Sequence, residues 1–494
     1  MRHACGYARA DSADEREAGT TRGTGTRTAV GQLLLAGCLC VLIRLPLLGV
    51  PLDADEGGYA YLARRWADGG RLYGRTVWVD RPQGLMLAYR LITALGRSPV
   101  LIHLAAIAAA LLLLVSVAAA AGALAGRRAA VLAAVLVAVV GAAPHLQGFM
   151  FNGELAAGGF AAASVAAAFE YRRAPRGWLL IASGVAGAVA VLMKQSGFDG
   201  LAAALVIGWS AGRLRAVLGI ATGAVLPIGA AMLQAALTSW HDWWFAIIGY
   251  RLDTTAGSRG GVSGRWHNIV TDLPRLWPDL LPLGLLGLAG LAFVVVRRQY
   301  LPLLWLIFAG IGFGGGVFFF PHYWMQLVGP LCLLGALALS ELPVRAAVAL
   351  TVLACLPAAG WTVRATAAGP DRRDRLAVPD TRLLANRDIA PWLREHARPG
   401  DQLYAFVSSA DLYYTTGLHT DFRYLWQANI EAIPGAVASL RAYLTGPDRP
   451  RWVVLYQRPD AIDPSGGIQR VLDAGYQRVA TVDGYSILTW VFTY

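Results

Sequence analysis

Hydrophobic residues fall into long apolar runs that short polar segments separate, from the first residues after 27 up to Trp361. A run of about 20 apolar residues is long enough to cross a bilayer as a helix. The apolar stretch 85–95 is too short to span, so we expect an interfacial or re-entrant helix there. We predict eleven membrane-spanning helices, at residues 28–50, 99–124, 129–146, 155–169, 177–193, 198–211, 216–237, 280–296, 301–320, 323–339 and 344–361.

A different pattern begins after Trp361, where the sequence has the composition of a soluble protein. Short alternating runs predict strands at 402–407, 452–456, 477–482 and 485–490, and longer periodic segments predict helices at 432–444 and 467–474. We therefore predict a small α/β domain over residues 380–494, with a partly parallel sheet. It carries no glycine fingerprint for a nucleotide, and we expect it to cap a site in the membrane domain, residues 28–362.

Composition supports a polytopic α-helical membrane protein. Of the 494 residues, 56% are hydrophobic and 15% are charged, and the mean hydropathy is +0.48, which is far more apolar than a soluble globular protein. The five cysteines are scattered and have neither zinc-ligand spacing nor the density of a disulfide framework. We predict no metal site from the cysteines, and no cofactor is certain.

The formal net charge of +12 comes from arginines in short clusters between apolar runs, not from a basic stripe with aromatic residues. This excludes nucleic acid as a partner and indicates membrane topology, because basic residues collect in cytoplasmic loops. We place the polar segment 1–27 in the cytoplasm as a disordered tail, and 380–494 outside a plasma membrane that the chain crosses many times. The clusters so placed inside are Arg127 and Arg128; Arg172, Arg173 and Arg176; Arg213 and Arg215; Arg297 and Arg298; and Arg345.

The first outside loop, residues 51–97, concentrates charge at the membrane surface. Asp53, Asp55 and Glu56 follow the first span directly, and three carboxylates there are costly without a purpose. Residues 58–66 predict a short amphipathic helix along the interface, with Tyr59 on its apolar stripe. The loop then places a cation, Arg81, on a turn before Pro82.

Further polar residues fall at the outside ends of later spans. Lys194 is the single lysine of the chain and ends an apolar helix, where its ammonium can neutralise a phosphate as a point charge; the alternative is a lysine that snorkels to the interface. Glu154 begins a span, where the helix dipole alone also favours a carboxylate. The remaining members of this group are Gln195, His322 and Tyr323.

Together these residues resemble the GT-C superfamily, the integral membrane glycosyltransferases that use polyprenyl-phosphate sugars. Within this superfamily, the sequence is similar to the branch of the protein O-mannosyltransferases and the lipid A aminoarabinose transferase, of the family 39 type. The likeness covers residues 28–340. It differs in two respects: Arg81, Pro82 and Gln83 stand where the aminoarabinose branch more often has Lys-Pro-Pro, and the inserted luminal domain of protein mannosyltransferases is absent.

The resemblance implies a single displacement that inverts the anomeric centre, with an envelope glycolipid, glycan or protein as acceptor. Asp55 is the expected general base, with Glu56 as its support or as a residue that orients the helix. Arg81 and Lys194 would hold the donor phosphate, and the other substrate-binding residues would be Asp53, Tyr59, Glu154, Gln195, His322 and Tyr323. We interpret the Asp53-Ala54-Asp55 match to a nucleotide-sugar motif as coincidental, although a divalent cation stays open.

Two other functions remain as alternatives at this point. A transporter or flippase of a lipid-linked sugar would also use charges in a membrane domain, but it typically carries them near the midplane and is built of repeated halves. An envelope assembly scaffold would leave Lys194 and the acidic cluster unexplained. The sequence specifies neither the sugar nor the acceptor.

Overall fold

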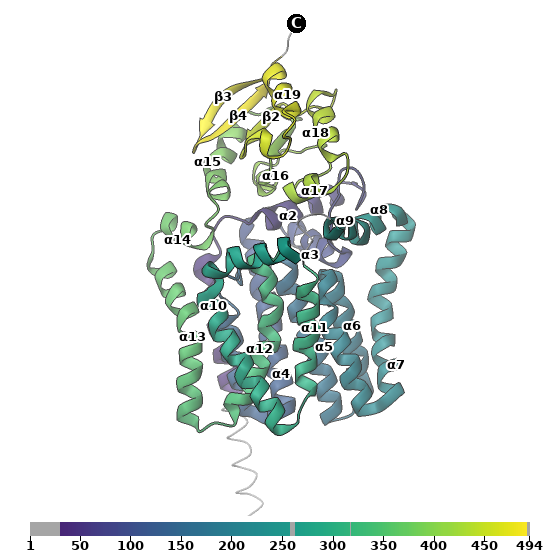
Figure 1. The fold of residues 1–494 in the computed structure, drawn as a ribbon, viewed down its shortest axis with the longest axis vertical. Helices are drawn as coiled ribbons and strands as arrows, with labels where there is room; N and C mark the ends of the chain where they lie inside the picture. Colours follow the sequence, from purple (N-terminus) through teal and green to yellow (C-terminus); the bar gives the residue numbers. More distant parts are fainter. Residues whose placement is uncertain (1–29, 257–261, 317, 492–494) are drawn as a thin grey trace, which may run out of the picture.

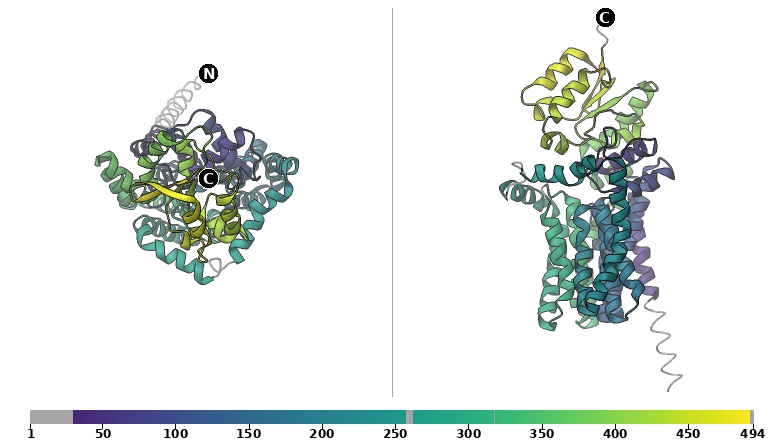
Figure 2. Two further views of the ribbon diagram at one scale, coloured as in Figure 1. Left: turned by 90° about the horizontal axis from the view of Figure 1, so that it is seen from above. Right: turned by 90° about the vertical axis from the view of Figure 1, so that its right-hand side faces the viewer.

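The computed structural model describes residues 30–256, 262–316 and 318–491; the predicted tail 1–27 lies outside them. The described chain forms an upright bundle of helices with a smaller α/β domain on one end (Figure 1). The view from above and the side view show that this domain sits over the bundle (Figure 2). The arrangement agrees with the predicted fold class, a helical membrane protein with a small C-terminal sheet.

The bundle contains the helices that the apolar runs predict. By length and composition, six helices of the described chain are long and apolar enough to cross a membrane, at Val30–Leu47, Pro99–Val140, Gln195–Thr238, Ser263–Arg297, Pro321–Ser340 and Val344–Ala367. Its helices are α4 (Pro99–Val140), α5 (Gly153–Arg173), α6 (Gly177–Met193), α7 (Asp199–Thr238), α10 (Val262–Arg297), α11 (Leu301–Gly314), α12 (Met325–Ser340) and α13 (Val344–Ala367).

Two of these long helices are each a pair of helices joined by a break. In α4, Ala125 and Gly126 leave helical geometry, and Gly126 has φ +77°, which glycine adopts without strain. In α7, the break falls at Arg213. Both breaks lie where the sequence separates two apolar runs, so α4 and α7 correspond to two predicted spans each. The number of crossings stays a prediction.

The predicted limits of three membrane spans are wrong. The span predicted at 301–320 ends at Gly314, because consecutive glycines at 314–316 do not sustain a helix. The span predicted at 129–146 ends at Val140. The span predicted at 280–296 belongs to α10, which begins at Val262 and contains prolines at 274, 278 and 282, since a helix can bend at proline without ending. Its first part runs along the top of the bundle before the helix descends (Figure 1).

The segment after Ala235, which is rich in Trp and Tyr and in which we predict no membrane span before residue 280, is mostly helical. It forms α8 (Trp240–Trp244), a π-helical turn (Phe245–Gly249) and α9 (Tyr250–Ala256). Trp243, Ile247 and Tyr250 are all buried. Their spacing of four and three residues is that of one helix face, a signal that the density of aromatic residues obscured.

Between the bundle and the C-terminal domain lie α2 (Ala54–Ala67) and α3 (Gln83–Ala94), the second at the predicted interfacial position. A capping box starts α2: the Asp53 side chain accepts from the Asp55 backbone N–H, and the Glu56 side chain accepts from the Asp53 N–H. We predicted one buried stripe from residue 58, but every residue from Glu56 to Ala63 is buried. The C-terminal domain covers the face of α2 that the sequence pattern predicted to be exposed.

The C-terminal domain contains a four-stranded sheet of order β1-β2-β4-β3. Strands β1 (Leu403–Phe406) and β2 (Trp452–Leu455) are parallel, whereas β4 (Tyr485–Trp490) is antiparallel to both β2 and β3 (Tyr476–Val482). The predicted strands and the partly parallel sheet are thus confirmed. The helices of this part are α14 (Pro370–Ala377), α15 (Thr381–His396), α16 (Asp411–Thr416), α17 (Gln427–Ala432), α18 (Ala436–Thr445) and α19 (Gly467–Gly475).

Two arginines of the predicted basic clusters contact the turn between α12 and α13. Arg128, near the break in α4, donates to the Leu342 carbonyl in that turn. Arg297, at the end of α10, pairs with Glu341 in the same turn. The turns between α10 and α11 and between α12 and α13 lie at the end of the bundle opposite the C-terminal domain (Figure 1). This asymmetry is the one that the basic clusters predicted, and the side of the membrane stays an expectation.

Candidate active site

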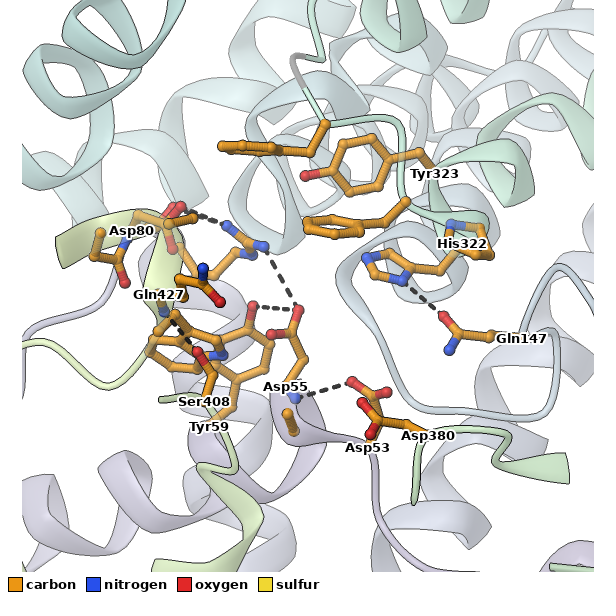
Figure 3. A pocket seen from close by; sticks show the side chains of 18 of the residues that line it. Asp53, Asp55, Tyr59, Asp80, Gln147, His322, Tyr323, Asp380, Ser408 and Gln427 are labelled. Carbon is orange, nitrogen blue, oxygen red and sulfur yellow. Dashed lines mark hydrogen bonds and ion pairs between the residues drawn. The ribbon is translucent and has the colours of Figure 1, made fainter. Parts of the chain in front are cut away.

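A cavity of about 310 Å³ lies where the bundle meets the C-terminal domain. One wall comes from the start of α2 and the Asp80–Arg81 turn, and another comes from residues 318–323 before α12. The C-terminal domain closes it with residues near Asp380, Ser408 and Gln427. Figure 3 shows these side chains converging from segments far apart in the sequence.

Asp55 projects into this cavity from the first turn of α2. Its Oδ2 accepts a hydrogen bond of 2.9 Å from the Tyr59 hydroxyl and lies 3.7 Å from Nη2 of Arg81. Tyr59 comes one helical turn after Asp55, so α2 itself fixes this pair. About a fifth of the Asp55 side chain stays exposed, at 21%.

The other carboxylates of the cavity are held by partners. Asp53 caps α2 through the Asp55 backbone N–H, and burial together with the neighbouring Asp55 carboxylate raises the pKa of Asp53 to about 8. Asp80 is bound by Arg81 and Arg251. Asp380 pairs with Arg382 of the same domain at 2.6 Å. Asp55 also has partners, but both of the contacts described above fall on its Oδ2.

Glu56 is close in sequence but lies on the inner side of α2 and does not line the cavity. Its Oε1 accepts from the Phe151 backbone N–H at 2.8 Å and its Oε2 from the Asp53 N–H at 3.1 Å. His103 of α4 lies 3.5 Å from the same carboxylate. With 1% of its surface exposed, Glu56 ties α2 to the bundle.

Two arginines share one carboxylate at the floor of the cavity. Asp80 accepts from Nη1 of Arg81 at 2.8 Å and from Nη2 of Arg251 at 2.6 Å. Although burial opposes its ionisation, the two guanidinium groups hold the pKa of Asp80 below its usual value. Sequence reasoning missed Arg251, which follows the buried Tyr250 in the aromatic segment; the helical spacing of that segment was the available signal.

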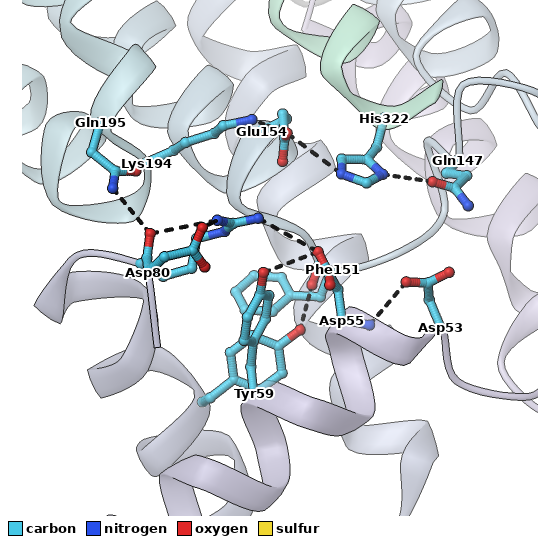
Figure 4. Close-up of polar contacts among 12 residues, drawn as sticks. Asp53, Asp55, Tyr59, Asp80, Gln147, Phe151, Glu154, Lys194, Gln195 and His322 are labelled. Atoms are coloured by element: carbon cyan, nitrogen blue, oxygen red, sulfur yellow. Dashed lines mark hydrogen bonds and ion pairs between the residues drawn. The ribbon is translucent and has the colours of Figure 1, made fainter. Parts of the chain in front are cut away.

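Lys194 belongs to a chain of polar groups beside this floor (Figure 4). Its ammonium pairs with Glu154 and lies 3.7 Å from the ring centroid of Tyr323, a cation–π contact. Glu154 is also 3.7 Å from Nε2 of His322, whose Nδ1 contacts Oε1 of Gln147 at 2.8 Å. These polar groups join α5, the turn after α6 and the segment just before α12. They bring together residues that are up to 175 positions apart.

A second, mostly apolar cavity of about 510 Å³ adjoins the first and contains Lys194 and Gln195. Side chains of α6, α7, the π-helical turn and α11 line it, and it shares Arg251 and Tyr323 with the polar cavity. Gln195 donates to the Asp80 carbonyl at 3.0 Å and so ties the two cavities together. The cations thus stand at the boundary between a polar and an apolar space.

Most of the residues predicted for the site are adjacent in the structure. The polar cavity is lined by Asp53, Asp55, Tyr59, Arg81, His322 and Tyr323, and the apolar cavity by Lys194, Gln195 and Tyr323. Glu154 lines neither cavity but pairs with Lys194, and Glu56 lies behind α2. Within the described residues, no group of three or more His, Cys, Asp or Glu side chains is arranged to bind a metal ion.

Comparison with known proteins relates the fold to solved structures. No protein-family model matches the chain, and a search of curated proteins gives no match to its sequence. The crystal structure of ArnT from Cupriavidus metallidurans in the apo state has a TM-score of 0.66 at 18% identity, over 94% of this chain and 98% of that one. ArnT bound to undecaprenyl phosphate gives 0.59 at 16% identity, over 93% and 98%.

A more distant match is the oligosaccharyltransferase AglB from Archaeoglobus fulgidus, in complex with an inhibitory peptide and a dolichol-phosphate. It gives a TM-score of 0.53 at 12% identity, over 87% of this chain and 69% of that one. At these identities the comparisons establish the fold. They confirm the predicted GT-C fold for a chain with several membrane-length apolar helices.

Proposed function

We propose that this protein is a glycosyltransferase that moves a sugar from a polyprenyl-phosphate donor to an acceptor hydroxyl, at the membrane face that carries the C-terminal domain. One observation carries the proposal: Arg81, Arg251 and Lys194 lie between a cavity lined by carboxylates and an apolar cavity. A lipid-phosphate sugar has the same sequence of parts, with a polar ring, an anion and an apolar chain. Structures of this fold with undecaprenyl phosphate and dolichol-phosphate support the same substrate class.

The isoprenoid chain would occupy the apolar cavity between α7 and α11, and the sugar would occupy the polar cavity. Asp80 and Glu154 neutralise much of the cationic charge at the boundary. The Asp80 carboxylate fixes both guanidinium groups in place, so that little reorganisation is required when a phosphate binds. Preorganised donors of this kind stabilise charge that develops on a leaving group.

In the proposed reaction, the acceptor oxygen attacks the anomeric carbon as the bond from that carbon to the phosphate oxygen breaks. The bonding electrons leave with polyprenyl phosphate, whose additional negative charge is stabilised by Arg81, Arg251 and Lys194. The acceptor hydroxyl proton passes to Asp55. One displacement inverts the anomeric centre.

Tyr59 and Glu56 would act through Asp55. The Tyr59 hydroxyl donates to Oδ2 of Asp55, which orients the carboxylate and leaves Oδ1 to accept the proton. Glu56 anchors the same helical turn to the Phe151 backbone. We therefore assign Glu56 a positioning role, in keeping with its expected role as the support of Asp55.

Transfer is tested with the purified protein in nanodiscs, supplied with polyprenyl-phosphate sugars extracted from cells grown on [14C]glucose. Membranes of cells that lack the gene supply the acceptors. We expect loss of label from the lipid fraction and its appearance in a new glycoconjugate. A flippase would leave the sugar on its lipid and move it between leaflets, and that result in reconstituted vesicles would overturn the proposal in favour of transport.

A further inference from the structure

A third cavity, of about 330 Å³, extends the proposed active site away from the apolar cavity. One wall is the start of α10, where His267, Asn268, Thr271 and Asp272 line it. The opposite wall includes the start of α17 in the C-terminal domain. This cleft adjoins the polar cavity, because four residues line both: Phe318, Phe320 and the first two residues of α17.

The α10 wall presents one polar helix face. Positions 267, 268, 271 and 272 are spaced by one and four residues, which places their side chains on the same side of a helix. They supply an imidazole, an amide, a hydroxyl and a carboxylate within a cleft wall. The Thr271 hydroxyl donates to the His267 carbonyl at 2.8 Å, so its oxygen is left as an acceptor. The set as a whole can both donate and accept hydrogen bonds, as a ligand rich in hydroxyl groups requires.

Aromatic rings lie between this cleft and the polar cavity. The rings of Phe318 and Phe320 lie 5.6 Å apart at 19°, and those of Phe320 and His322 lie 5.9 Å apart at 22°. Phe320 is 44% exposed, although it is a large apolar side chain. Near-parallel rings with an open surface offer faces on which the C–H side of a sugar ring can pack.

The cleft and the apolar cavity have no lining residue in common among those that the structure describes. A donor whose chain fills the apolar cavity would therefore leave the cleft free. The two routes also differ in chemistry, since one is lined by hydrocarbon and the other by polar and aromatic side chains. A lipid-anchored acceptor would be expected to enter between membrane helices and to need a second apolar route.

We infer that the acceptor is the end of a polar glycan chain, and that it enters through the cleft between α10 and α17. This inference rests on the proposed function and specifies its acceptor class. The Phe318 and Phe320 rings contact the sugar face and the α10 side chains bind its hydroxyls, which leads one hydroxyl toward Asp55. Binding of a peptide by addition to a sheet edge is excluded at this cleft, because no residue of β1–β4 lines it.

The acceptor class is tested with the same labelled donors and gene-deficient membranes. After the reaction, the products are separated into water-soluble polysaccharide, extractable lipid and protein digested to peptides. We expect the label in polysaccharide. Label in lipid or peptide would overturn this inference and leave the transferase intact, whereas label that stays on the donor would count against the proposed function itself.

The entry of the acceptor through the cleft is tested by placing a bulky side chain on its wall. In Thr271→Trp, an indole on the cleft wall should raise the KM for polysaccharide at least about tenfold and leave donor affinity, measured by native mass spectrometry, within twofold. Val270→Trp is the matched control because Val270 is the preceding residue of α10, is 44% exposed and does not line the cleft. A normal KM in Thr271→Trp, with thermal stability equal to that of the control, would show that the acceptor does not use this cleft.

Discussion

The backbone of Asp411 lies so close to Gly57 that a Cβ on Gly57 would stand 2.3 Å from the Asp411 Cα. At the next position, a Cβ on Gly58 would stand 2.7 Å from the Trp426 ring. Both contacts join α2, which carries Asp55, to the C-terminal domain. Asp411 is itself held by Asn386 at 2.6 Å and Ser409 at 2.9 Å, so the contacting backbone has little freedom to move away. Glycine is required here for close approach.

Gly57→Ala should therefore displace the C-terminal domain from α2. Overpacking at a close contact costs about 1–3 kcal/mol, and we expect faster hydrogen exchange in α2 and α16 together with at least about tenfold lower transfer activity. Gly158→Ala is the matched control, because Gly158 is also within a helix and has open space around it. Unchanged exchange and activity in Gly57→Ala would show that the two parts do not depend on this contact.

Asp55→Asn tests the proposed base. An amide keeps the size of the carboxylate and its acceptor for the Tyr59 hydroxyl but has no basic lone pair near neutral pH. Removal of a general base typically lowers the rate by 100- to 10,000-fold. We expect a loss of this size in kcat with donor affinity retained, and no recovery at higher pH. Near-normal turnover in nanodiscs would remove Asp55 from this role.

The neighbouring carboxylate provides the comparison. Glu56→Ala leaves the Phe151 and Asp53 N–H groups and His103 without their buried partner. Breaking a buried ion pair costs about 3–5 kcal/mol, so we expect a much lower melting temperature in detergent. Asp55→Asn should melt like the native protein. An equal loss of stability in the two variants would contradict the distinction between the base and its anchor.

The donor-phosphate site is tested by removing its cations one at a time. Arg81→Ala, Arg251→Ala and Lys194→Ala should each weaken the binding of polyprenyl phosphate, measured by native mass spectrometry, by roughly 10- to 100-fold, since charge-assisted hydrogen bonds contribute about 1.5–3 kcal/mol. Arg81→Lys should be milder because the charge survives without the forked geometry. Arg75→Ala, at a side chain 71% exposed in the same loop, is the control. Unaltered affinity in all three alanine variants would place the phosphate elsewhere.

Donor binding should also depend on pH through Lys194, which lies in the turn after α6. Burial lowers the pKa of this ammonium to about 8, although the pairing with Glu154 opposes the shift. Lys194 is protonated below that pH and loses its charge above it, so the affinity for polyprenyl phosphate should fall between pH 8 and 9, by up to about tenfold. Lys194→Arg stays charged and should have a flat profile. The same decline in both proteins would exclude Lys194 as its cause.

Topology is tested by reporters fused at the two ends of the bundle. Alkaline phosphatase, which is active only outside the cytoplasm, should be active when fused after residue 400 and inactive when fused after Arg298, in the turn between α10 and α11. The expectation follows from the positive-inside rule. Activity only in the second fusion would invert the orientation and with it the side on which the donor must be presented.

Sequence alone determined the features that depend on local pattern. Apolar runs specify helices wherever the chain must bury hydrocarbon or face lipid, so each of the eleven predicted ranges falls on a helix of the described chain, with errors at proline- and glycine-rich ends. The alternation of hydrophobic and polar residues likewise predicted the strands of the C-terminal sheet, because it is also a local pattern. The acidic cluster at 53–56 and Lys194 could be selected because a charged side chain next to the hydrocarbon region is costly unless it has a partner or a function.

Tertiary structure alone decided where these residues lie. Asp55 and Glu56 are adjacent and chemically alike, yet the direction of α2 turns one toward the cavity and buries the other against Phe151. Arg251 joins Asp80 across 171 positions, and the domain after Trp361 supplies Asp380 and Gln427 to the cavity. Periodicity reports which face of a segment is buried, but it does not report which distant segment covers that face. That choice depends on close packing between helices, down to the missing side chain of Gly57.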